Sequence, residues 1–144
     1  MRNQVYYEDI AAGSKIPPLT KHPTTRQLVK WAGASTDYNE IHYDKDWAIS
    51  KRLPQQIVQG QLAASFLCQL ITDWIGLEGE LKKIYCSYRG MNLPGEAIVC
   101  KGQVAKKYTE SGINYVECQI WTENPRKEKT VVGSAVVTLP SKAR

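Results

Sequence analysis

A segment in the middle of the chain is apolar around most of a helix, and it reads Gly60-Gln61-Leu62-Ala63-Ala64-Ser65-Phe66-Leu67-Cys68-Gln69-Leu70-Ile71-Thr72-Asp73-Trp74-Ile75. Its polar residues recur at three- and four-residue spacing, which predicts a single polar stripe on an α-helix. A helix that is apolar elsewhere has to be covered by other structure. At 1.5 Å per residue the helix is about 24 Å long, which is too short to cross a bilayer core of about 30 Å. We therefore expect a central helix in a protein that does not span a membrane.

Four segments after this helix have the composition of β-strands. They are rich in Val, Ile, Tyr and Trp, they alternate in polarity, and turn residues separate them. The predicted strands are Leu81–Met91, Glu96–Tyr108, Ile113–Asn124 and Lys129–Leu139. Strands that follow one another so closely are expected to form an antiparallel meander. The last of them is apolar on both faces, which predicts an interior strand.

The segment before the central helix predicts short helices and turns. Gly and Pro interrupt any helix in residues 6–18. Thr24 is predicted to cap a helix that ends near Gly33, and Asp44 to cap another that ends at about residue 51. We predict one α+β domain over residues 1–144, in which an antiparallel sheet wraps around one long central helix.

Charge and cysteine content limit the partners and the kinds of site that the sequence predicts. The formal net charge is +5, but lysines and arginines are scattered in pairs rather than gathered into the basic stripe that nucleic-acid binders use. Mild positive charge fits a phosphorylated carrier such as coenzyme A, or an acidic carrier protein. The four cysteines have no CxxC or metal-ligand spacing, so we expect free buried thiols and no metal site. Residues 1–5 lack the apolar core of a secretion signal, and we expect the protein in the cytoplasm.

Asp37 and His42 are the candidate catalytic residues. Five positions apart, they share neither a helix face nor a strand face, so their side chains can meet only across a turn. Residues 33–39 are rich in turn formers. A carboxylate and an imidazole brought together in this way can act as a general acid–base pair. The alternative is a turn aspartate beside a packed histidine.

The chain resembles the MaoC-like hydratases and dehydratases, which have the hotdog fold. Their signature, Asp-x-Asn-Pro-x-His, is matched here by Asp37-Tyr38-Asn39-Glu40-Ile41-His42. The resemblance covers nearly the whole chain and includes Tyr7-Glu8-Asp9-Ile10, Trp31-Ala32-Gly33-Ala34-Ser35, Ile57-Val58-Gln59-Gly60 and the stretch from Tyr88-Arg89 to Pro94-Gly95-Glu96. Two positions depart from the family pattern. Glu40 stands where the family has proline, and Gln59 where it commonly has histidine.

The resemblance implies a hydro-lyase of fatty acid metabolism that reversibly hydrates trans-2-enoyl thioesters to 3-hydroxyacyl thioesters, usually of R configuration. The acyl group is carried by coenzyme A or an acyl carrier protein, and no metal or redox cofactor takes part. Asp37 and His42 would activate water and move the α-carbon proton. The backbone N–H of Gly60 would bind the thioester oxygen, as a helix start favours. Asn39 would orient the loop, and Ser65 would lie near substrate.

Other functions remain open from the sequence. The resemblance implies a homodimer whose sheets join edge to edge, but the chain could also pair with a different hotdog subunit. In such a hetero-oligomer it could bind acyl thioesters without catalysis. A hotdog thioesterase is a further alternative. Gly60 could be only a helix-start glycine, and Ser65 could bond only to the preceding turn of its own helix.

Overall fold

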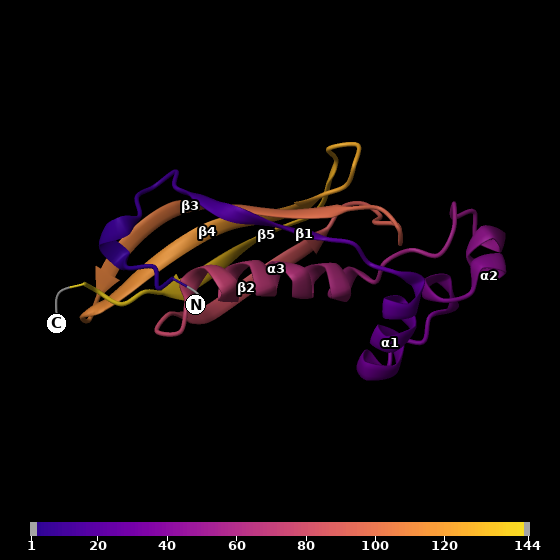
Figure 1. Ribbon diagram of the computed structural model, residues 1–144, viewed down its shortest axis with the longest axis horizontal. Coiled ribbons are helices and arrows are strands. Elements are labelled where there is room, and N and C mark those ends of the chain that lie inside the picture. Colours follow the sequence, from indigo (N-terminus) through magenta and orange to yellow (C-terminus); the bar gives the residue numbers. More distant parts are fainter. Residues whose placement is uncertain (1–2, 143–144) are drawn as a thin grey trace.

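The computed structural model describes residues 3–142. A five-stranded antiparallel sheet lies over one long helix, and shorter helices gather beyond one end of the sheet (Figure 1). The elements, in chain order, are the 3₁₀-helix η1 (Tyr7–Asp9), β1 (Lys15–Lys21), α1 (Thr25–Ser35), the 3₁₀-helix η2 (Glu40–His42), α2 (Lys45–Ser50), α3 (Gly60–Ile75), β2 (Glu80–Tyr88), β3 (Ile98–Glu110), β4 (Ile113–Glu123) and β5 (Lys129–Thr138).

The central helix forms where the sequence predicts it. α3 contacts all five strands. Its apolar side chains fill the concave face of the sheet, and the most deeply buried of them are Leu67 and Ile71. Burying a leucine or isoleucine side chain stabilises the fold by roughly 1.5–3 kcal/mol. The expected α+β architecture, a sheet wrapped around one helix, is therefore confirmed.

The order of the strands corrects the expected meander. The sheet runs β1-β3-β4-β5-β2, so only β3, β4 and β5 follow one another as hairpins. β2 pairs with β5, and the chain then crosses to the opposite side of the sheet before β3 begins. The N–H groups of Arg89 and Gly90 donate to the Thr130 carbonyl at the start of this crossing, and the Gly95 N–H donates to the Pro23 carbonyl near its end. Closeness in sequence favours pairing only when a tight turn joins two strands, and this connection is not one.

An edge strand, β1, begins within residues 6–18, where the sequence predicted that Gly and Pro interrupt any helix, and it was not predicted. It pairs with β3, and its register shifts between Ile16 and Leu19, where Pro17 and Pro18 stand. Proline has no N–H to donate, so in a sheet it is tolerated at an edge or a bulge. The two prolines argued against a strand in the sequence. They also explain why the strand lies at the edge of the sheet.

The shorter helices carry the candidate site to one end of the sheet. α1, η2 and α2 lie beyond the first turn of α3, far from the two ends of the described chain (Figure 1). The Ile57 N–H donates to the Ile41 carbonyl, and the Val58 N–H donates to the Asn92 carbonyl. These bonds tie the segment before α3 both to the loop with Asp37 and to the crossing after β2. No helix within residues 3–142 is long and apolar enough to cross a membrane.

Candidate active site

The residues that end helix α1 determine how the backbone turns before Asp37. The helix was expected to end near Gly33 but continues to Ser35, and Thr36 follows in the left-handed region at φ 61°. The Ser35 hydroxyl donates to the Trp31 carbonyl over 2.7 Å and accepts from the Asp37 N–H over 3.2 Å. A serine that bonds both ways can end a helix and begin a turn. The chain therefore reverses just before the candidate carboxylate.

Asn39 holds the loop between the two candidate catalytic residues, as the sequence analysis expected. Its side-chain oxygen accepts from the Ile41 N–H over 3.3 Å and so caps η2. Its carbonyl accepts from the His42 N–H over 3.1 Å, while its own N–H donates weakly to Asp37 Oδ1 over 3.4 Å. Because these contacts are local, Asn39 shapes the turn that links Asp37 to His42.

The turn brings Asp37 and His42 together. Asp37 Oδ2 lies 3.6 Å from His42 Nε2, and the carboxylate side chain is 37% exposed while the imidazole is 9% exposed. The other ring nitrogen, Nδ1, lies 2.8 Å from the carbonyl oxygen of Ile57. A carbonyl can only accept, so Nδ1 carries the proton of the neutral ring. Nε2 therefore presents a lone pair toward Asp37, as a general base requires.

A hollow of about 340 Å³ opens beside this pair, on the inner side of the sheet at the start of α3. It is lined by Asp37, His42, Ile57, Val58, Gly60, Gln61, Tyr88, Gly90, Met91, Asn92 and Val131. The first N–H groups of a helix have no partner within the helix, and the helix dipole makes this end attractive to negative charge. The hollow therefore combines an acid–base pair with the donor end of a helix.

Gly60 is required here because an aromatic ring lies against it. A Cβ at this position would come within 2.9 Å of two carbon atoms of the Tyr88 ring. The sequence predicts no role in the site for Tyr88. The structure places it at the wall of the hollow, where it remains 54% exposed. Tyr88 begins one of the stretches that resemble the family, but no sequence signal places its ring against Gly60.

Ser65 does not join this group. It lies on α3 beyond its first turn, outside the hollow, and its hydroxyl donates to the Leu62 carbonyl over 2.7 Å. That bond is the local alternative that the sequence left open for a helical serine. Ser65 is not among the residues that line the hollow. Met91 and Asn92 do line the hollow, and although they lie in the stretch that resembles the family, the resemblance gave neither of them a role.

Within residues 3–142, neither the buried thiols of Cys100 and Cys118 nor a cluster of metal-ligating side chains adds a reactive group to this pair. Burial raises the pKa of the Cys100 and Cys118 thiols to about 12, so both are protonated at neutral pH. Among residues 3–142, no three His, Cys, Asp or Glu side chains gather closely enough to hold a metal ion. Asp37 and His42 are thus the candidate reactive groups that the described chain brings together in this hollow.

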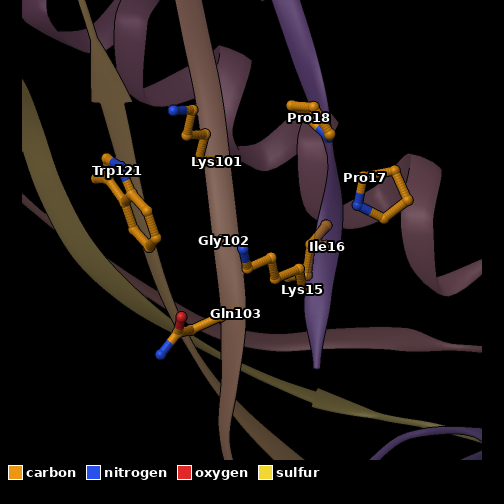
Figure 2. A pocket seen from close by; sticks show the side chains of 8 residues that line it. All are labelled: Lys15, Ile16, Pro17, Pro18, Lys101, Gly102, Gln103 and Trp121. Atoms are coloured by element: carbon orange, nitrogen blue, oxygen red, sulfur yellow. The ribbon is translucent and has the colours of Figure 1, made fainter. Parts of the chain in front are cut away.

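Another hollow, of about 470 Å³, lies away from this pair on the outer side of the sheet (Figure 2). Lys101, Gln103 and Trp121 project into it from β3 and β4, and Lys15 closes it on the β1 side. Lys101 is held by an ion pair of 2.8 Å with Glu123. The hollow contains no candidate acid–base pair, so its size does not make it the reactive site.

Comparison with known proteins identifies the family. A family model described as "MaoC like domain" matches residues 11–124, which include Asp37, His42 and Gly60. The chain belongs to the MaoC-like family. Among curated proteins, this MaoC-like chain is 28% identical over 122 residues to the fatty acid synthase subunit beta of Gibberella zeae. The match covers 82% of the chain but only 6% of that much longer protein.

Solved structures share the MaoC-like fold of the chain. The R-hydratase PhaJ1 of Pseudomonas aeruginosa matches with a TM-score of 0.87 at 20% identity, over 96% of this chain and 88% of that one. The (R)-hydratase of A. caviae involved in PHA biosynthesis matches with a TM-score of 0.83 at 22% identity, over 92% and 99%. The ChsH1–ChsH2 complex of Mycobacterium tuberculosis matches with a TM-score of 0.78 at 17% identity, over 89% and 97%. At these identities the likeness shows the hotdog fold.

One departure from the MaoC-like pattern is buried beside the site. Gln59 is fully buried, and its side-chain N–H donates to the Leu28 carbonyl of α1 over 2.8 Å. Its side-chain oxygen has no hydrogen-bond partner in the described chain. Gln59 thus ties the start of α3 to the helix that leads to Asp37, although it leaves one polar atom unsatisfied, which costs about 1–3 kcal/mol.

Replacing Glu40, the other departure, with the family's proline should not destabilise the protein. Glu40 is the first residue of η2, and the preceding Asn39 has φ −65° and ψ 120°, a conformation that is favoured before proline. Proline at the first position of a helix loses no internal hydrogen bond. We therefore expect Glu40→Pro to raise the free energy of unfolding by about 0.4–1 kcal/mol. Urea denaturation would measure the change, and a loss of more than 1 kcal/mol would show that the Glu40 side chain supports the turn.

Proposed function

We propose that this protein hydrates trans-2-enoyl thioesters to 3-hydroxyacyl thioesters, with Asp37 and His42 as the acid–base pair. The observation that carries the proposal is the separation of 3.6 Å between Asp37 Oδ2 and His42 Nε2 at the edge of a hollow. That separation is longer than a direct hydrogen bond. One water molecule can donate a hydrogen bond to both groups at about 2.8 Å. The pair is thus suited to hold the water that adds to the substrate.

Both Asp37 and His42 take part in the proposed addition of water. His42 Nε2 takes a proton from the water while Asp37 accepts its second hydrogen bond and orients it. The water oxygen bonds to the β-carbon, and the electrons of the double bond move through the α-carbon onto the thioester oxygen. The imidazolium then returns its proton to the α-carbon. Overall, one water molecule is added, no group is oxidised or reduced, and the proposed reaction requires neither a metal nor a redox cofactor.

The start of α3 is the proposed site for the negative charge of the enolate. The N–H of Gly60 points from a helix N-terminus, where the dipole favours an anion. The missing Cβ allows the thioester and the Tyr88 ring to approach the same backbone. An oxyanion donor of this kind typically contributes a factor of 10² to 10³ in turnover.

We propose a dimer that joins two sheets through β2. The sheet has two edge strands, β1 and β2. Pro17 and Pro18 interrupt the hydrogen-bonding potential of β1, whereas β2 extends over nine residues without proline. Tyr85 and Tyr88 on β2 are more than half exposed, as an uncovered interface would leave them. A second copy is the proposed partner, and a different hotdog chain would use the same edge.

Purified wild-type protein assayed with trans-2-enoyl-CoA substrates of increasing chain length tests the proposed function. We expect conversion to the 3-hydroxyacyl-CoA, with an optimum that reports the length of the acyl pocket. Sedimentation of the same sample should give twice the monomer mass of 16.2 kDa. Tight binding of every thioester without turnover would instead indicate a non-catalytic acyl-binding subunit. Release of free coenzyme A thiol would indicate a thioesterase.

A further inference from the structure

A chain of buried hydroxyl and amide groups leads from the sheet into the hollow beside Asp37 and His42. Thr122 on β4 and Thr130 on β5 are fully buried, and Asn92 in the crossing after β2 is 4% exposed. The hydroxyl oxygens of Thr122 and Thr130 lie 2.8 Å apart, and Thr130 Oγ1 lies 2.8 Å from Asn92 Oδ1. Buried polar groups cost free energy unless they are hydrogen-bonded, so these contacts hold the three side chains in fixed positions.

The direction of these hydrogen bonds follows from the contact with Asn92. The Thr130 hydroxyl donates its one proton to the Asn92 side-chain oxygen. Thr130 Oγ1 must therefore accept from the Thr122 hydroxyl, whose oxygen also accepts from the Val131 N–H over 3.0 Å. An amide has one accepting and one donating end. With its oxygen bound to Thr130, the Asn92 amide turns its NH₂ away from the threonines.

The side-chain NH₂ of Asn92 remains available to donate a hydrogen bond into the hollow. Its backbone carbonyl already accepts from the Val58 N–H over 2.8 Å, which places Asn92 against the segment that leads to Gly60. Within residues 3–142, neither hydrogen of its side-chain NH₂ meets an acceptor. The side-chain nitrogen of Asn92 keeps some exposed surface. In the described chain, the side-chain polar atoms that are fully buried without a hydrogen-bond partner are Trp31 Nε1 and Gln59 Oε1, and the Asn92 nitrogen is not one of them. Asn92 lines the hollow that also contains His42 and Gly60.

We propose that the side-chain NH₂ of Asn92 donates a hydrogen bond to the thioester carbonyl oxygen of the substrate, alongside the N–H of Gly60. This assignment rests on the proposed function. Two donors that converge on one oxygen stabilise the enolate better than one, and a donor held rigidly before the reaction needs no reorganisation during it. Thr130 is a positioning residue, since it acts only by holding the Asn92 amide in the donating orientation.

Asn92→Asp tests the contact. Aspartate has the same shape and keeps an acceptor for the Thr130 hydroxyl, but it presents oxygen where the amide presented NH₂. With crotonyl-CoA we expect kcat to fall about 100-fold, as for loss of one oxyanion donor. Asn114→Asp, at the far end of β4, makes the same chemical change away from the hollow and should leave kcat unchanged. A kcat for Asn92→Asp within threefold of the wild-type value would overturn the proposal.

Substitutions at Thr130 test the orientation of the amide separately from the fold. Thr130→Val keeps the shape but removes the proton that holds Asn92 Oδ1, so we expect kcat to fall at least tenfold while KM changes little. Thr130→Ser keeps the hydroxyl and should recover most of the lost turnover. Both are measured well below their melting temperatures. Equal kcat values for the valine and serine variants would contradict the positioning role.

Binding of a saturated thioester separates this proposal from the proposed function. Butyryl-CoA cannot be hydrated but presents the same carbonyl oxygen. Calorimetry should show binding to the wild-type protein that weakens about 3- to 10-fold in Asn92→Asp, as for loss of one hydrogen bond. If the wild type bound butyryl-CoA but did not hydrate crotonyl-CoA, the proposed function would fail while weaker binding in the variant would still support the Asn92 contact. Unchanged binding in the variant would overturn it.

Discussion

Asp37→Asn should lower the turnover of crotonyl-CoA by a factor of about 10² to 10⁴, the range for loss of a positioned acid–base group. The amide keeps the size of the carboxylate and can still accept from the Asn39 N–H, so the turn should persist. It cannot orient the water toward His42 as a charged acceptor does. We therefore expect substrate binding to survive while turnover is lost, and steady-state kinetics would measure both.

The same chemical change elsewhere in the helical region is the matched control. Asp46 is exposed in the first turn of α2, outside the hollow, so Asp46→Asn should have the kinetics of the wild type. The two histidines allow a parallel comparison. His42→Gln should lose most turnover, whereas His22→Gln, at an exposed position before Pro23, should not. Wild-type hydration by Asp37→Asn would show that the carboxylate has no part in the reaction.

Gly133→Ala should cost about 3 kcal/mol or more of folding free energy, at the upper end for overpacking. Gly133 lies on β5 opposite Cys86 of β2. A Cβ there would overlap the carbonyl oxygen of Tyr85 and come within 2.9 Å of its carbonyl carbon. These atoms are backbone, so they can move away only if β2 separates from β5. Because domains of this kind are stable by only about 5–15 kcal/mol, urea denaturation should show a large fall in the midpoint or an unfolded variant.

Gly33→Ala makes the same substitution where the structure leaves room. Gly33 is exposed within α1, and a Cβ there would meet no atom within 4 Å. Alanine is favoured over glycine inside a helix by about 0.5–1 kcal/mol, so this variant should be slightly more stable than the wild type. If Gly133→Ala and Gly33→Ala had equal stability, the close pairing of β2 with β5 would be wrong.

The central helix and the hairpin strands could be predicted because each carries its own local signal. The polar stripe from Gln61 to Asp73 defined α3, whose observed bounds, Gly60–Ile75, are those predicted. Alternating polarity located the four predicted strands to within three residues at every end. The turn between Asp37 and His42 also followed from the sequence, because two residues five positions apart share neither a helix face nor a strand face.

Features that depend on distant parts of the chain could not be predicted in this way. The pairing of β2 with β5 depends on close backbone approach at Gly133, and the edge strand β1 contains two prolines that argue against a strand. Tyr88 reaches the site only because Gly60, from another element, leaves space for its ring. Asn92 becomes informative only when Thr130 and Thr122 are seen to fix its amide. Such residues are ordinary in the sequence and acquire a role from their neighbours.

Reaction of the wild-type protein with crotonyl-CoA in ¹⁸O-labelled water tests most directly whether Asp37 and His42 add water across a carbon–carbon double bond. Mass spectrometry should find one ¹⁸O atom at the β-carbon of an intact 3-hydroxybutyryl-CoA, and this product should nearly disappear with Asp37→Asn. Unsaturated free acid with ¹⁸O in its carboxylate, together with free coenzyme A, would show that the pair cleaves the thioester instead and would contradict the account.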